Sequence, residues 1–189
     1  GAWLIDATSG TLTQTGWPSL TIDSAKLRYT GPSLFVTECT LRNGAGRLTV
    51  NGEMRFDRLA DFQAKFTNIP VTPLLPEDWR VRLHGNVSGN AHITAKLPGG
   101  APRVTGDLQL SDGQIEAIPL LDQIATFPRT ERFRRVVLTR GSVSFDQNAG
   151  LTNLRNLVLE SEGLLRLEGN CQIAQDRIDG RFQLGVTAA

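Results

Sequence analysis

The sequence is poor in the side chains that carry most protein chemistry. It holds two cysteines, two histidines and one methionine, and only 6% of its 189 residues are aromatic. The net charge is +1, so no electrostatic footprint favours nucleic acid, and few aromatic rings are available to stack on bases. These shortages argue against a nucleic-acid partner.

Long apolar runs are also absent from the sequence. No stretch approaches the roughly 18 residues that a membrane-spanning helix needs. The chain begins Gly1-Ala2-Trp3, without the basic start and apolar core of a signal peptide. Because glycine stands where an initiating methionine is usual, we interpret the chain as an excised fragment and expect any membrane anchor to lie outside it.

The few candidate catalytic groups are not clustered. His84 and His92 fall on the polar side of alternating segments, which favours solvated histidines over metal ligands. The carboxylates Glu160, Glu162 and Asp179 are scattered along similar polar sides. The sequence therefore predicts no catalytic residues, no metal, no cofactor and no enzymatic activity.

The two cysteines, Cys39 and Cys171, both fall on the apolar side of their segments. Two interpretations are open: buried thiols that pack as small apolar side chains, or a single disulfide bridge. Two cysteines do not make a disulfide framework, so the first interpretation is favoured.

What the sequence does contain is alternation of apolar and polar residues. Alternating side chains point to opposite faces of a strand. The alternating segments are 25–29, 48–56, 62–66, 81–87, 91–97, 104–110, 141–145, 165–173 and 178–186. Between them lie turn signals, at 30–33, 43–44, 97–100, 111–113 and 146–150. Short strands joined by tight turns predict an antiparallel all-β fold.

One strand pattern occurs twice. Leu48, Val50, Gly52, Met54 and Phe56 match Leu165, Leu167, Gly169, Cys171 and Ile173 at a constant offset. The similarity extends to a twofold repeat of about 25–69 and 141–186, joined by linking strands and a helix over 79–135. A unit used twice is typical of stacked repeats whose neighbours bury shared faces. We interpret residues 1–189 as a single domain.

Helical periodicity is limited to one region. Leu120, Ile124 and Phe127 have helical spacing between two prolines, which predicts a short amphipathic helix at about 119–127. The segment 71–79 is too rich in proline for more than one turn. Beyond the helix, a basic cluster of Arg129, Arg132, Arg134 and Arg135 is either a solvated helix end or a contact for acidic lipid head groups or a protein.

Three stretches of the chain resemble a known family. The segments "VRLHGNVSGNAHITAKLPGGAPRVTGDLQLSDGQI" (81–115) and "RGSVSFDQNAGLTNLRNLVLESEGLLRLEGNCQIAQDRIDGRFQLGV" (140–186) are similar to glycine and alternation patterns of AsmA-like and TamB-like proteins of the Gram-negative envelope. Between them, "IPLLDQIATF" (118–127) resembles the short helix of these proteins. Two departures are the missing membrane anchor and "KLPGG" in place of a shorter link.

The resemblance implies a fold and a function. Family members are elongated, curved antiparallel sheets that form an open groove across the periplasm, and they are implicated in phospholipid transport or outer-membrane maintenance. The chain would then be the periplasmic part of an inner-membrane-anchored protein, with phospholipid or another acyl lipid, and an envelope protein, as partners.

The resemblance also implies a lipid-binding set on the repeated strands. These residues are Leu48, Val50, Met54, Phe56, Leu165, Leu167 and Ile173. The alternative is that the same residues form the closed core of a β-sandwich, which would be a non-enzymatic scaffold or protein-interaction module.

Overall fold

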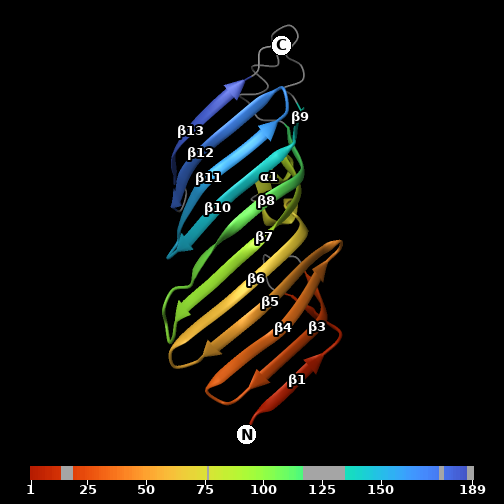
Figure 1. The fold of residues 1–189 in the computed structure, drawn as a ribbon, viewed down its shortest axis with the longest axis vertical. Helices are drawn as coiled ribbons and strands as arrows, with labels where there is room; N and C mark the ends of the chain where they lie inside the picture. Colours follow the sequence, from red (N-terminus) through yellow and green to blue (C-terminus); the bar gives the residue numbers. More distant parts are fainter. Residues whose placement is uncertain (14–18, 76, 117–134, 175–176, 187–189) are drawn as a thin grey trace.

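The computed structural model describes residues 1–13, 19–75, 77–116, 135–174 and 177–186. In this part of the chain the strands form one antiparallel sheet, and they are stacked along the long axis of the molecule (Figure 1). The first strand and the last strand lie at opposite ends of the stack. The all-β antiparallel fold expected from the alternation is confirmed.

The strands are mostly ten or more residues long, as continuous alternation over that length requires. They are β1 (Trp3–Ala7), β2 (Gly10–Leu12), β3 (Leu20–Tyr29), β4 (Ser33–Asn43), β5 (Gly46–Arg55), β6 (Leu59–Pro70), β7 (Leu83–Lys96), β8 (Arg103–Glu116), β9 (Arg135–Leu138), β10 (Arg140–Asn148), β11 (Leu151–Ser161), β12 (Leu165–Ala174) and β13 (Arg177–Val186). Two short helical turns, η1 (Thr72–Leu74) and α1 (Glu77–Arg80), join β6 to β7.

The sheet is a meander, because each strand pairs with its neighbour in the chain. The order is β1-β3-β4-β5-β6-β7-β8-β10-β11-β12-β13. The two strands off this path prolong others: β2 continues the line of β1 along β3, and β9 continues the line of β10 along β8. In the part of the chain that the structure describes, β1–β2 and β13 are therefore the two edges.

Tight turns and bulges shape the sheet. Ala149 and Gly150 both have positive φ, which suits the two-residue hairpin between β10 and β11. Asn68 and Asn156 adopt the left-handed conformation inside bulges of β6 and β11. A bulge bends its strand and increases the local twist, so these positions add curvature to the sheet.

The described residues form one compact core cluster, and it lies at the strand ends of β8, β9 and β12. Ile115, Val136, Leu138, Leu164 and Leu165 pack together where β8 and β9 meet the turn between β11 and β12. Among the described residues, Val136 is the only large side chain that is fully buried. The chain exposes 12402 Å² of surface, whereas a compact monomer of this mass exposes about 8900 Å². The sheet is open, and the expected alternative of a closed sandwich is wrong for the described strands.

Several other expectations require correction or lie outside the described part. The turn expected at 111–113 is instead a bulge within β8, where Asp112 has a φ of 51°. The segments 81–87 and 91–97 belong to one long strand, β7. The edge strands β1 and β2 were not expected. The predicted helix at 119–127 lies outside the described residues, whereas 71–79 does form only single turns.

Candidate functional site

One face of the sheet, here called the apolar face, carries apolar or small side chains on every strand from β3 to β13. Its central row is a chain of directly opposed cross-strand pairs that crosses the strands stacked along the long axis of the molecule (Figure 1). The row consists of Ala25, Cys39, Val50, Ala64, Ala91, Gly106, Phe145, Leu154, Cys171 and Gly180. No residue in this row is charged.

Two further rows flank the central one. The first consists of Leu27, Val36, Gly52, Phe62, Ile93, Val104, Gln147, Thr152, Ile173 and Ile178. The second consists of Ile22, Leu41, Leu48, Phe66, Gly89, Leu108 and Val143. Only Gln147 and Thr152 bring polar atoms to these rows. The apolar face is therefore continuous along the stack.

Glycines on the apolar face lie opposite phenylalanines. Gly52 is opposite Phe62, and Gly169 is opposite Phe182. An added Cβ would stand 2.7 Å from Phe62 Cδ1 and 2.6 Å from Phe182 Cδ1, so each ring lies against its glycine. Each ring covers the glycine backbone that a side chain would otherwise cover, so the apolar face has no gap at the glycine.

The predicted lipid-binding residues lie on the apolar face in two separate groups. Leu48, Val50 and Met54 come from β5 and are half-buried. Phe56 follows β5 at the rim, is 45% exposed, and packs edge-to-face on Tyr29 with ring centroids 6.3 Å apart. The rim position leaves Phe56 partly open to solvent.

The second group comes from β12. Leu167 and Ile173 are half-buried, whereas Leu165 is only 8% exposed and belongs to the compact core. Six strand spacings separate β5 from β12, which is about 29 Å at the usual distance between strands. The two groups share a face but do not form one small pocket.

Sequence reasoning did not assign to the site the residues between these two groups. Phe62, Phe66, Ile93, Leu108 and Phe145 lie on the apolar face between β5 and β12. The signal was present, because each of them belongs to an alternating segment. They were not predicted because the predicted set was taken only from the two matching segments, 48–56 and 165–173.

The two cysteines are free thiols on the central row. Cys39 on β4 and Cys171 on β12 are seven strand spacings apart, about 34 Å, which excludes a bridge within one chain. Both are half-buried, less than expected, since they face an open sheet. Desolvation raises the pKa of each thiol.

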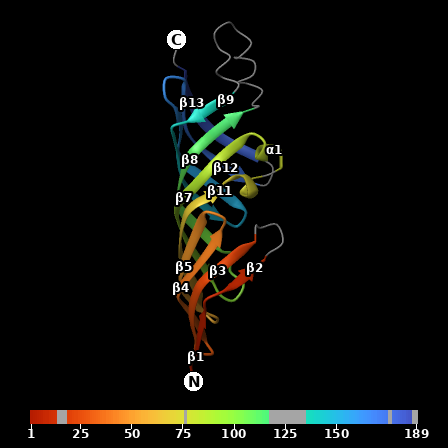
Figure 2. The same ribbon diagram turned by 90° about the vertical axis from the view of Figure 1, so that its right-hand side faces the viewer.

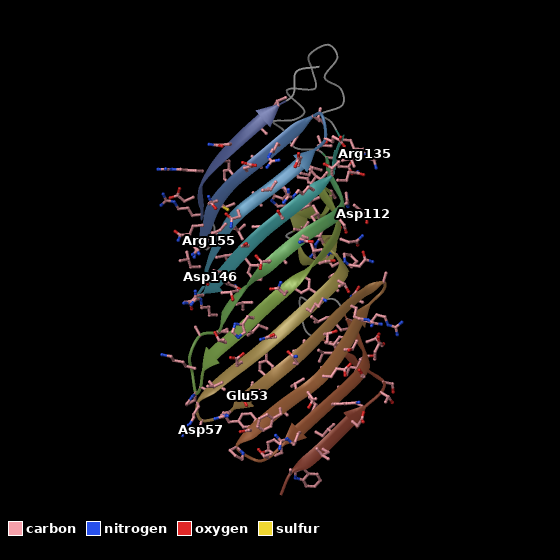
Figure 3. The ribbon with its side chains drawn as sticks, in the orientation of Figure 1. Glu53, Asp57, Asp112, Arg135, Asp146 and Arg155 are labelled. Atoms are coloured by element: carbon pink, nitrogen blue, oxygen red, sulfur yellow. The ribbon has the colours of Figure 1, made fainter. Side chains whose placement is uncertain are left out.

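The opposite face of the sheet is polar and its charges pair with one another. Arg103 donates to both carboxylate oxygens of Asp146, at 3.0 Å from Nε and 2.7 Å from Nη2. This hydrogen bonding lowers the pKa of Asp146. Asp146 also lies beside Arg155 of the neighbouring strand (Figure 3). His92 pairs with a carboxylate as well, as expected for a surface histidine.

An open hollow of about 550 Å³ lies on this polar face. It is lined by the polar residues Thr49, Asn51, Gln63, Lys65, Asn90 and His92, together with Ala64 and Ala91. Within the described ranges no three metal-ligating side chains come together. The chemistry of the polar face is that of a solvated surface.

The remaining described features are the short helix α1, the strand β2 and Arg135. Figure 2 shows α1 and β2 on the same side of the sheet. Arg135, the one member of the basic cluster inside the described part, donates from Nη2 to Gln114 Oε1 at 2.7 Å. The other three arginines of that cluster lie outside the described residues.

Comparisons with known proteins do not assign this chain. No family model, no curated protein and no solved structure matches it. None of the described helices has the length and apolar character required to cross a bilayer. The apolar face is therefore the feature on which a functional proposal rests.

Proposed function

We propose that the apolar face is an open groove that binds or conducts the acyl chains of lipids. The observation that carries the proposal is the run of apolar cross-strand rows from β3 to β13, over which the described residues place no second sheet. Monomeric proteins rarely leave apolar patches larger than a few hundred Å² uncovered. A bound acyl chain would supply the missing cover.

The energetics of such a complex are favourable. Each methylene removed from water contributes about 0.8 kcal/mol, so a sixteen-carbon chain gains on the order of 10 kcal/mol before ordering costs. The rows cross the strands stacked along the long axis of the molecule, so a chain could occupy any of several positions along them. A continuous face without a defined end suits passage better than retention.

We propose in addition that the sheet contains a twofold repeat. In this reading β4–β5–β6 corresponds to β11–β12–β13. Two features support the correspondence: Gly52 and Gly169 each face a phenylalanine, and a bulge follows Val36 in β4 and Leu154 in β11. Repetition would lengthen a groove without changing its cross-section.

The cellular setting follows the resemblance stated above. We place the chain in the periplasm as a non-enzymatic segment of an AsmA-like envelope protein in phospholipid transport or outer-membrane maintenance. A scaffold or protein-interaction module is the second candidate. It is favoured by the local core around Val136, which shows that part of the sheet is stabilised by ordinary packing.

Charge placed on the apolar face separates the two candidates. Val50 lies on the central row and is half-buried, whereas the next residue, Asn51, is exposed on the polar face. In an open groove the carboxylate of Val50→Glu stays hydrated, so the protein should fold while binding of a fluorescent fatty-acyl probe falls about ten-fold or more. Asn51→Glu is the matched control and should keep both properties.

Two measurements are needed for each variant: a thermal melt and a probe titration. If protein side chains cover the apolar face around Val50, an unpaired carboxylate there costs several kcal/mol, and each kcal/mol lowers the melting temperature by about 2–4 °C at this size. A parent protein that never binds the probe, together with a Val50→Glu variant that does not fold, would favour the scaffold. Native mass spectrometry of the parent should also detect co-purified phospholipid.

A further inference from the structure

The central row of the apolar face changes in side-chain size along its length. From β3 to β8 the row consists of small and medium residues, namely Ala25, Cys39, Val50, Ala64, Ala91 and Gly106. On β10 and β11 it has Phe145 and Leu154 instead. The floor of the row is therefore lower from β3 to β8 than on the two strands that follow.

Larger side chains line both sides of this low stretch, which is here called the trough. They are Leu27, Val36, Phe62, Ile93 and Val104 on one side, and Ile22, Leu41, Leu48, Phe66 and Leu108 on the other. Ala25 and Ala64 are only 6% and 9% exposed, although the described residues place no second sheet over them. The larger neighbours therefore shield the floor of the trough.

The dimensions of the trough suit one unbranched hydrocarbon chain. It is one side chain wide, and the five strand spacings from β3 to β8 amount to about 24 Å. The two leaflets of a bilayer share a hydrocarbon core of about 30 Å, so one lipid chain spans about 15 Å. A single chain thus fits within the trough along its whole length.

A polar pair lies on the apolar face where the trough ends. Gln147 of β10 is directly opposite Thr152 of β11, in the flanking row beside Phe145 and Leu154. Gln147 is also opposite Val104 of β8, so the pair begins one strand beyond the trough. Gln147 is exposed and Thr152 is half-buried. Both side chains are therefore open to a ligand on this face.

Closeness to the turn between β10 and β11 does not by itself explain these polar residues. The hairpin of β12 and β13 has Ile173 opposite Ile178 at the same separation along the chain. The hairpin of β5 and β6 has Met54 opposite Ala60 near its turn. Pairs at the ends of other hairpins are thus apolar, and the polar pair is particular to the end of the trough.

We infer that the trough holds one acyl chain and that Gln147 and Thr152 bind the carbonyl oxygen of its polar end, an ester or a carboxylate. The inference rests on the proposed function and names the place and the chemical class of its ligand. The amide N–H of Gln147 and the hydroxyl of Thr152 both donate hydrogen bonds, which ester and carboxylate oxygens accept. The apolar face continues beyond Phe145, so the site is a resting point for a lipid that passes along it.

The order of residues sets the direction of the bound chain. From β10 the floor falls toward β8 and β7, where the next residues of the central row are Gly106 and Ala91. Toward β11 the next residue is Leu154, which keeps the floor high. The hydrocarbon therefore extends from the polar pair toward β3 and not toward β13 (Figure 1).

Displacement of a fluorescent fatty-acyl probe tests the polar end. Dodecanoate and methyl dodecanoate carry the carbonyl as an acid and as an ester, whereas dodecyltrimethylammonium has no oxygen and accepts no hydrogen bond. In Gln147→Leu and in Thr152→Val, binding of a carbonyl competitor should weaken about three- to ten-fold. Binding of dodecyltrimethylammonium should not change. The carbonyl competitor that weakens more identifies the polar end as ester or acid.

Bulk added at matched distances on the two sides of the polar pair tests the direction. Ala91 on β7 and Cys171 on β12 are half-buried residues of the central row, and each is two strand spacings from β10. Ala91→Leu fills the trough and should weaken binding of every competitor about ten-fold. Cys171→Leu is the matched control and should leave binding unchanged. Thermal melts should show that all four variants are folded.

The outcomes separate this inference from the proposed function. A parent protein that does not bind the probe would refute both. A parent that binds the probe, with Gln147→Leu and Thr152→Val changing all competitors equally or none of them, would overturn this inference alone. Weaker binding in Cys171→Leu but not in Ala91→Leu would place the chain on the other side of the pair and would overturn it as well.

Discussion

A methyl group added at Gly169 should loosen the edge of the sheet. The Cβ of an alanine there would clash with the backbone oxygen of Arg181, and it would stand 2.6 Å from Phe182 Cδ1 and 3.1 Å from Phe182 Cα. Carbon atoms in favourable contact are about 3.5–4.0 Å apart, so the β13 backbone must move as well as the ring. Overpacking of this kind costs about 1–3 kcal/mol, and a loss of 2 kcal/mol would lower the melting temperature by about 4–8 °C at this size.

Two other glycines set the scale for this prediction. A Cβ at Gly185 of β13 would meet only Arg166 O at 3.8 Å, so Gly185→Ala should leave stability unchanged or slightly higher. Gly52 has a φ of +147°, and its Cβ would lie 2.6 Å from Phe62 Cα. Because β5 is held between two paired strands, Gly52→Ala should destabilise more than Gly169→Ala.

Thermal and urea unfolding followed by circular dichroism would measure this order. The expected ranking of stability is Gly185→Ala at or above the parent, then Gly169→Ala, then Gly52→Ala. If Gly169→Ala were as stable as Gly185→Ala, Phe182 would not lie over Gly169. The register of β13 on β12 would then be wrong.

Two further predictions concern titratable groups. Desolvation raises the pKa of Cys39 and Cys171, so both thiols should react more slowly with a thiol reagent in the folded protein than in urea at the same pH; equal rates would place them in open solvent. The hydrogen bonds from Arg103 lower the pKa of Asp146 in the folded state. The Arg103–Asp146 pair therefore stabilises the folded protein at pH values above the pKa of Asp146 in the unfolded chain, and this stabilisation is lost as pH falls through the pKa in the folded protein. At pH values under about 4, the melting temperature of the parent should therefore decrease more than that of Asp146→Asn. Parallel curves of melting temperature against pH for the two proteins would contradict this.

Much of the fold was predictable because alternation is a local property. The alternation of apolar and polar residues over 48–56 and 178–186 predicts strands with one apolar face, and the structure has β5 and β13 there. Bulges are harder, since one left-handed residue moves the apolar positions by one without ending the strand. At Asp112 the apolar side changes from Leu110 to Gly113 and Ile115, and the sequence around it looks like a turn.

The sequence predicted which face of the sheet carries the candidate site, but it did not predict where on that face the site residues lie. Parity put Leu48 and Leu167 on the same side of the sheet, as the structure has them. Their separation depends on how many strands lie between them, which only the pairing order decides. The burial of Leu165 depends on contacts with β8 and β9, far away in the chain, and no local pattern reports such contacts. The edge strand β1 was missed because Trp3-Leu4-Ile5 does not alternate.

The meander order has a consequence for how such a molecule changes in size. Since each strand contacts mainly the strands next to it in the chain, a hairpin inserted at any turn would find its place without displacing the rest. Each insertion would lengthen the stack by two strand spacings, about 9.6 Å. The length of the sheet could therefore change between related proteins in steps of one hairpin.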